Sequence, residues 1–212
     1  MMPRRPSTRL YLRVMPVAAM AMLLVILTAC TALPDKPARP TVYDFGPPPA
    51  ATQARADGGV TLQLNELQAP SALDGTAMLY RLLYADPTQL RSYAQARWSM
   101  PPAQLLRQRL RAGLAQGFSV VLPEQARAER QLRIELEEFS QVFDAPDRSS
   151  ALLRLHATLV LVRPGSELLL AQRSFTVSQA APSADAPGGV RALAAAADAL
   201  VQQLQPWLLS VR

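Results

Sequence analysis

The sequence predicts an α+β domain over residues 41–212, in which a mostly antiparallel sheet carries two main helices packed chiefly on one face. Three observations support this prediction. Most apolar segments alternate with polar residues at the two-residue period of a strand. Only two stretches repeat apolar residues at helical spacing, which is too few helices to cover both faces of a large sheet. The order is strands, helix, strands, helix.

The first half of the domain contains four expected strands, at residues 41–45, 60–64, 78–84 and 90–98. Both faces of the third segment are largely apolar, which predicts a strand covered on both sides. Residues 46–59 contain three consecutive prolines and two consecutive glycines and are expected to form a loop. Asp86-Pro87 is expected to form the turn before the fourth strand.

The second half begins with a predicted helix. Ser99 is its expected N-cap, Pro101 and Pro102 lie in its first turn, and Gly117 marks its end. Strands follow at 118–122, 132–137, 153–162 and 168–177, with a turn at Pro164-Gly165. The last three strands are expected to form an antiparallel meander. After a loop at 180–189, the final helix carries an apolar stripe: Val190, Leu193, Ala194, Ala197, Leu200, Val201 and Leu204.

The first 29 residues have the organisation of a secretory signal peptide. Four arginines (Arg4, Arg5, Arg9 and Arg13) without any acid are followed by an apolar run at 17–29. That run is shorter than the roughly 20 residues that a membrane-spanning helix needs. It ends in Leu27-Thr28-Ala29-Cys30, which resembles the lipobox of bacterial lipoproteins. The alternative is an N-terminal membrane anchor with a chance cysteine.

The lipobox resemblance implies that Cys30 becomes the mature N-terminus and carries diacylglycerol and an N-acyl chain such as palmitate. Two long acyl chains anchor a protein stably. Thr31 follows the cysteine, whereas aspartate there retains lipoproteins of enteric-type bacteria in the inner membrane. We therefore expect the periplasmic face of the outer membrane. Residues 30–40 form a proline-rich tether that extends at about 3.1 Å per residue.

Composition excludes several classes of function. Cleavage removes four of the 22 basic residues and no acid, which leaves 18 basic against 16 acidic residues. This near-neutral balance gives no support for nucleic-acid binding. Cys30 is the only cysteine, so its acylation removes disulfides, cysteine nucleophiles and thiolate metal sites. We expect no metal and no cofactor beyond the covalent lipid.

Few side chains are candidates for catalysis. Glu135 and Glu137 share one face of a strand at about 7 Å, a separation reminiscent of glycosidase carboxylates. A solvated sheet face beside Arg133 is the plainer interpretation. His156 lies in an alternating strand without an identifiable partner, and the sequence lacks the common hydrolase and nucleotide-binding motifs. A periplasmic hydrolase is therefore the weakest hypothesis.

Aromatic and arginine side chains between residues 84 and 111 are candidates for a partner interface. Arginine and aromatic residues dominate interface hot spots, but aromatic residues are equally ordinary in a core, and both interpretations stay open. Arg107 and Arg111 share a helix face, which is either solvated or in contact with an acidic partner or lipid headgroups. The candidates are Tyr84, Tyr93, Arg97, Trp98, Arg107 and Arg111.

Residues 80–110, YRLLYADPTQLRSYAQARWSMPPAQLLRQRL, resemble the auxiliary lipoproteins of ABC-type transport systems, the PqiC-like family. Shared features are a tyrosine-containing strand, a Q-L-x-x-Y segment, an arginine-tryptophan pair and a proline-led leucine helix. The Tyr43-Asp44-Phe45 strand and a strand with Arg173 and Phe175 also fit. The matching residues are Tyr84, Gln89, Leu90, Tyr93, Arg97, Trp98, Pro101, Pro102, Leu105 and Leu106.

The resemblance implies a non-catalytic role in lipid traffic. Such lipoproteins accompany an MCE-domain protein, an inner-membrane permease and an ATPase, which together move phospholipids or related molecules between two membranes. The lipoprotein would be the docking or receiving end in the periplasm, and it is also a candidate homo-oligomer. The alternative is a structural envelope lipoprotein that assembles or stabilises an outer-membrane machine.

We predict that Cys30→Ser abolishes acylation, because a hydroxyl does not replace the thiol in this modification. Metabolic labelling with an alkyne palmitate analogue measures the effect, with the substitution Thr31→Ser as the control. Label retained by the Cys30 variant, or absent from the unaltered protein, would contradict lipidation at this site.

Overall fold

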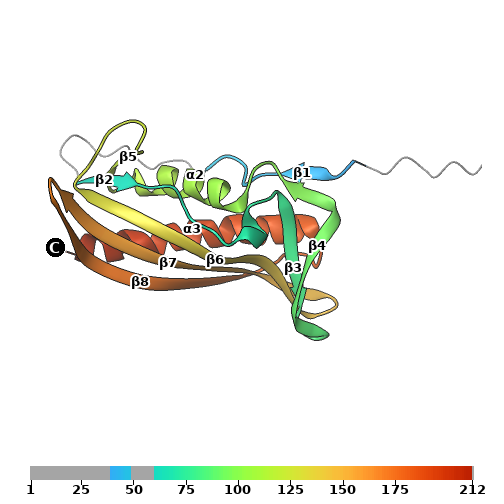
Figure 1. Cartoon of the computed structure of the whole chain (residues 1–212). Coiled ribbons are helices and arrows are strands. Elements are labelled where there is room, and N and C mark those ends of the chain that lie inside the picture. Colours follow the sequence, from blue (N-terminus) through green and yellow to red (C-terminus); the bar gives the residue numbers. More distant parts are fainter. Residues whose placement is uncertain (1–38, 49–59, 212) are drawn as a thin grey trace, which may run out of the picture. The chain divides into compact units, whose positions relative to one another are not determined.

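A computed structural model describes residues 39–48 and 60–211 of the chain. From Arg39 onward the chain forms one compact unit in which an eight-stranded sheet packs against two helices (Figure 1). The sheet is mixed and mostly antiparallel, so the predicted α+β class is confirmed. The predicted signal peptide, Cys30, most of the tether and part of the 46–59 loop lie outside the described residues.

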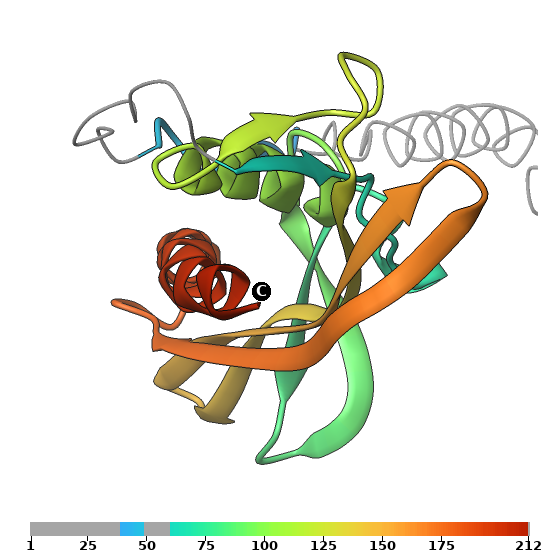
Figure 2. The same cartoon turned by 90° about the vertical axis from the view of Figure 1, so that its left-hand side faces the viewer.

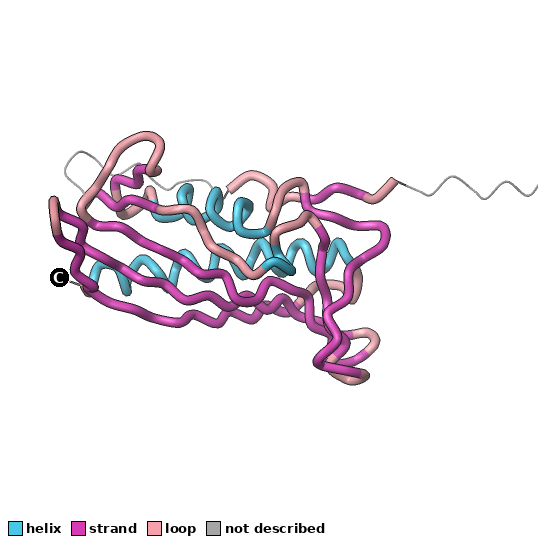
Figure 3. The backbone as a smooth tube through the Cα atoms, viewed as in Figure 1, coloured by secondary structure: helices cyan, strands magenta, loops and turns pink. Residues whose placement is uncertain are grey.

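Figure 3 shows how strands alternate with the helices along the backbone. The elements in chain order are β1 (Thr41–Tyr43), β2 (Thr61–Leu64), the 3-10 helix η1 (Ser71–Leu73), β3 (Ala77–Leu82), β4 (Asp86–Trp98), α2 (Pro102–Leu114), β5 (Ser119–Val121), β6 (Arg130–Ala145), β7 (Arg148–Arg163), β8 (Ser166–Ala180) and α3 (Ala186–Ser210).

The predicted meander is confirmed, because β6, β7 and β8 pair antiparallel along nearly their whole lengths. The turn at Pro164-Gly165 joins β7 to β8, and Gly165 has a φ of 77°, a conformation that glycine adopts without steric cost. These strands are longer than the alternating segments suggested. Their polar ends, such as Arg148 and Ser166, extend the ladders beyond the apolar pattern.

Strand β6 organises the sheet because both of its edges are used. One edge pairs with β7, and the other pairs in parallel with β2 near Leu132 and with β3 near Gln141. β4 then joins β3 antiparallel, while β1 and β5 add short parallel pairings with β4 and β2. These parallel pairings were not predicted, since they join segments that are distant in sequence and leave no local pattern.

The sheet curves around α3, which lies in its concave side with α2 beyond it (Figure 2). The predicted stripe of α3 is confirmed: Leu193, Leu200 and Leu204 are fully buried, and of its predicted members only Ala194 is partly exposed. The two helices approach closely at Gly113, where an added Cβ would lie 2.6 Å from a Val201 methyl carbon. Both helices therefore lie mainly on one face, as predicted.

One predicted chain reversal is displaced. The turn between β3 and β4 lies at residues 83–85 and not at Asp86-Pro87, because Asp86 already begins β4 and its carboxylate accepts the Thr88 N–H at 2.9 Å. The third strand is consequently shorter than predicted, and Leu83 and Tyr84 are exposed in the turn and not covered on both sides.

Both predicted helix starts are also corrected. Ser99 does not cap α2, since Pro101 occupies the N-cap and the Ser99 N–H donates to the Tyr43 carbonyl at 2.7 Å. α3 begins at Ala186, not Val190, because the Asp185 carboxylate accepts the Gly188 N–H at 2.7 Å. Within the described residues, neither helix combines the length and apolarity needed to cross a bilayer.

We predict that Leu200→Asp lowers the free energy of unfolding by about 3 kcal/mol or more, because it removes a buried side chain and buries an unpaired charge. For a chain of this size the melting temperature should fall by at least about 6 °C, measured by circular dichroism. Gln203→Asp on the exposed face of α3 is the matched control and should change little. An unchanged melting temperature for the Leu200 variant would contradict the packing.

Candidate functional site

The six predicted interface residues do not form one surface. Tyr84 lies in the turn between β3 and β4 and is 49% exposed. Arg97 is exposed near the opposite end of β4, beside Val42 of β1. The length of β4 separates these two side chains, so they cannot contact the same small feature of a partner.

Trp98 belongs to the core. It is 1% exposed, and its ring makes edge contacts with Phe45 and Phe139 at centroid distances of 5.8 and 5.6 Å. Side chains alternate across a strand, so Arg97 faces solvent while its neighbour Trp98 faces inward. The structure therefore places Trp98 in the core, as the core interpretation expects, and not on a surface that is open to a partner.

Tyr93 is half-buried and has a structural partner. Its hydroxyl donates to the Gln141 Oε1 at 2.9 Å, and burial raises the pKa of the phenol, which keeps it a neutral donor. The fully buried Gln141 amide donates in turn to the Ser149 hydroxyl at 2.8 Å and to the Asp185 carbonyl at 3.2 Å. This network ties β4 and β7 to the start of α3, so Tyr93 is occupied in holding the fold.

Arg107 and Arg111 share one face of α2, as predicted, and point toward the loop between β5 and β6. Their contacts there are long: Arg107 Nη2 lies 3.4 Å from the Glu124 carboxylate, and Arg111 Nη2 lies 3.5 Å from the Gln125 Oε1. Arg107 Nε is buried and has no acceptor among the described residues. The buried Nε is out of a partner's reach, but the terminal nitrogens of both guanidinium groups have only these long internal contacts and retain donors for a partner.

A cleft of about 350 Å³ lies beside Arg107, between the start of α2 and the segment that leads from β2 to η1. Leu67 and Pro101 give it apolar walls, while Glu66 and Asp74 are exposed acids at its margin. We call this cleft together with Arg107 and Arg111 the α2 face. It combines a hollow, unused arginine donors and both charge signs, which suits recognition of a protein segment.

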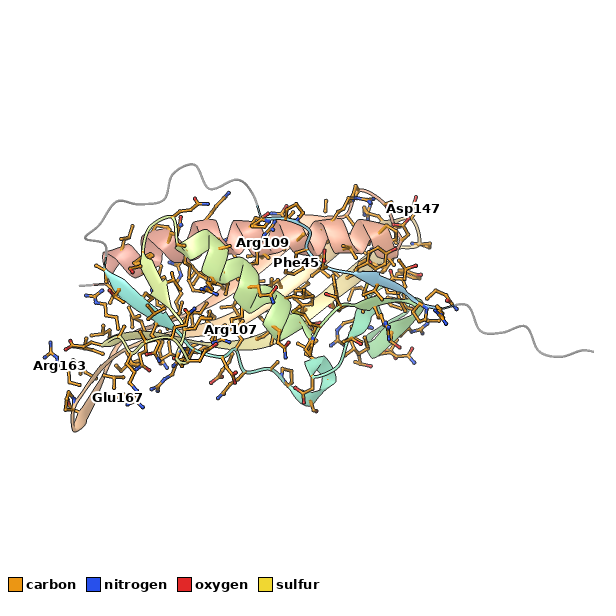
Figure 4. The ribbon with its side chains drawn as sticks, turned by 90° about the horizontal axis from the view of Figure 1, so that it is seen from above. Phe45, Arg107, Arg109, Asp147, Arg163 and Glu167 are labelled. Atoms are coloured by element: carbon orange, nitrogen blue, oxygen red, sulfur yellow. The ribbon has the colours of Figure 1, made fainter. Side chains whose placement is uncertain are left out.

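Arg109 is a buried and firmly held arginine that was not among the predicted site residues. Its buried guanidinium forms two hydrogen bonds with Asp198 of α3, at 2.6 and 2.8 Å, and a third with the Pro47 carbonyl at 3.1 Å (Figure 4). The signal was present, because Arg109 follows Leu105 and Leu106 at helical spacing on the apolar face of α2. A charge at such a position requires a buried partner.

The weak catalytic candidates are explained by ordinary surface contacts. His156 Nδ1 lies 3.0 Å from the Ser174 hydroxyl oxygen, and Glu137 pairs with Arg154 at 2.9 Å. Arg133 of β6 pairs with Glu167 of β8 at 2.7 Å, across the intervening strand β7. Nowhere in residues 39–48 and 60–211 do three or more histidine or acidic side chains gather in a group that suits a metal ion.

Comparison with protein families gives a match to the ABC-type transport auxiliary lipoprotein component family over residues 43–205. The chain belongs to this family. The predicted resemblance is thereby confirmed, and the matched segment covers every described element from the end of β1 to most of α3. A comparison with curated proteins gives no match.

Two crystal structures share the fold of this family member. One, of a protein from Xanthomonas campestris, has 21% sequence identity and a TM-score of 0.64, and the match covers 80% of this chain and 95% of that one. The other, of an uncharacterized protein, has 16% identity and a TM-score of 0.63, with coverage of 81% and 99%. At these identities the likeness concerns the fold alone.

We predict that Trp98→Ala lowers the free energy of unfolding by about 3–5 kcal/mol, because it leaves a cavity between Phe45 and Phe139. Thermal denaturation of the purified chain measures this loss. Tyr84→Ala, which removes an exposed aromatic ring, is the control and should melt close to the unaltered protein. Near-native stability of the Trp98 variant would reopen its interpretation as an interface residue.

Proposed function

We propose that this chain is the non-catalytic docking component of an ABC-type intermembrane lipid transport system, held at the periplasmic face of the outer membrane by acyl chains on Cys30. The observation that carries the proposal is the family match over residues 43–205, supported by the lipobox-like segment 27–30. The expected partners are an MCE-domain protein and, through it, an inner-membrane permease and an ATPase. The ATPase supplies the energy, and the lipoprotein supplies a binding surface.

The α2 face is the contact surface that we favour. Its arginines have weak internal partners, in contrast to the outer face of β6–β8, where Arg133 and Arg154 each lie against a carboxylate. A partner that brings an acidic side chain to Arg107 and an apolar one into the cleft would satisfy donors that the chain leaves unused. Tyr84 and Arg97 remain exposed candidates for separate, secondary contacts.

The rigidity of α2 also supports a docking role. Gly113 brings it against α3, and Arg109 fixes it to Asp198, so the exposed side chains project from a firmly held helix. Little conformational freedom is then lost when a partner binds, which favours affinity.

We predict that the full-length lipoprotein, purified from membranes in mild detergent, carries the MCE-domain protein, permease and ATPase with it. Reversal of both charges in Arg107→Glu/Arg111→Glu should reduce the amount of co-purified MCE protein about tenfold or more, because the pair would then repel an acidic partner. Arg148→Glu, an exposed arginine in the β6–β7 hairpin, is the matched control and should bind normally.

Three results would contradict parts of the proposal. Co-purification of an outer-membrane machine without any transporter would favour the structural-lipoprotein alternative. Full binding by the double variant would remove the α2 face from the interface. Recovery of the protein from inner-membrane fractions of a density gradient would contradict the location.

A further inference from the structure

A second cleft lies far from the β6–β7 hairpin, at the end of the sheet where β6 begins and β7 passes into β8. Figure 4 shows Arg163 and Glu167 at this end and Asp147 at the other. The cleft has a volume of about 520 Å³ and is lined by the start of β2, the segment before β6 and the β7–β8 hairpin. We call it the basic cleft, after Arg127, Arg130 and Arg163, which line it.

The charges of the basic cleft are poorly compensated. Glu129 is the single acid among its lining residues, and its 3.3 Å contact with Arg163 joins two side chains that are both largely exposed. Such a pair contributes little to stability. Arg130 donates to the Val211 carbonyl at 3.1 Å, and the exposed Arg127 forms no hydrogen bond or ion pair with any described residue. Three guanidinium groups therefore share one carboxylate and one carbonyl.

The basic cleft also has an apolar side. Val60, Leu161 and Leu170 line it, and Val60 is 47% exposed. Beyond its margin, Leu168 and Leu169 on the edge strand β8 are 59% and 54% exposed. Leu168 is the partner of the lining residue Leu161 in the β7–β8 ladder, so its exposed side chain extends the apolar side of the cleft, and exposed apolar surface of this kind marks a binding site.

We infer that the basic cleft binds one phospholipid, with the phosphate held by the arginines and the first part of an acyl chain over Val60, Leu161 and Leu170. Guanidinium groups bind phosphate oxygens through paired, charge-assisted hydrogen bonds. The volume is within the range of small-molecule sites and suits a headgroup with its glycerol, not a whole lipid. The choice of a phospholipid among phosphate-bearing amphiphiles rests on the proposed function.

The test uses the full-length lipoprotein in living cells. A photoreactive benzoylphenylalanine replaces the exposed Leu168, opposite Leu161 of the cleft, the cells are grown with radioactive phosphate, and the irradiated protein is purified and weighed by mass spectrometry. We expect an adduct with the mass of a phospholipid. The same residue placed at Pro146, in the exposed β6–β7 turn, should give less than about a tenth as much adduct, because that turn has no comparable arginine cluster.

Variants in the same background identify the phosphate site. Arg127→Glu/Arg163→Glu should reduce the adduct at least about tenfold, since each charge-assisted hydrogen bond lost weakens binding. Arg127→Lys/Arg163→Lys should retain most of it, and Arg148→Glu should retain all of it. Equal melting temperatures of these variants show that the loss does not come from unfolding.

Three outcomes would overturn the inference. The first is an absent adduct, and the second is an adduct that survives the double charge reversal. The third is an equal amount of adduct at positions 168 and 146, which would indicate contact with a bilayer surface. The result is separable from the proposed function. Co-purified transporter without a lipid adduct would reject the basic cleft alone, and an adduct without transporter partners would reject the docking role alone.

Discussion

The buried guanidinium of Arg109 joins three parts of the chain that are far apart in sequence. It extends from α2 to Asp198 of α3 and to the Pro47 carbonyl just after β1. A buried charge is tolerated only when it is paired, so the ion pair with Asp198 is needed to keep Arg109 buried. They fix the orientation of α2, and with it the direction in which Arg107 and Arg111 project.

Local periodicity predicted what depends on neighbouring residues. The meander β6–β8 and the buried stripe of α3 follow from repeats of two and 3.6 residues, whereas the shared edge of β6 joins β2 and β3 to it across 60 residues or more. The candidate interface residues were harder to predict. Alternation places Arg97 and Trp98 on opposite faces of β4 but does not say which face is buried. Which face of β4 is buried depends on its pairing with β1 and β3 and on the contacts of Trp98 with Phe45 and Phe139.

The α2 face and the basic cleft differ in chemistry, and this suits two different ligands. The first has weakly paired arginines beside exposed acids, and the second has an excess of arginine beside exposed leucines. Between them, the outer face of β6–β8 is lined with matched ion pairs and hydroxyl contacts. A surface whose charges are already paired does not compete for either ligand. The acidic partner can therefore be recognised by the α2 face and the phosphate by the basic cleft.

The three-residue strand β1 has a mechanical consequence. In a protein anchored through Cys30, any tension between the membrane and the domain enters the fold at Thr41. The short ladder with β4, the hydrogen bonds from Ser99 to Tyr43 and from Arg109 to Pro47, and the packing of Phe45 on Trp98 and Phe139 stand between that tension and the rest of the core. β1 pairs with β4 over three residues, so it would yield to such a pull before the much longer ladders of β6–β8. The first element to detach under force would thus be the short edge strand β1. The rest of the domain would stay folded, and β1 could pair with β4 again once the force ended.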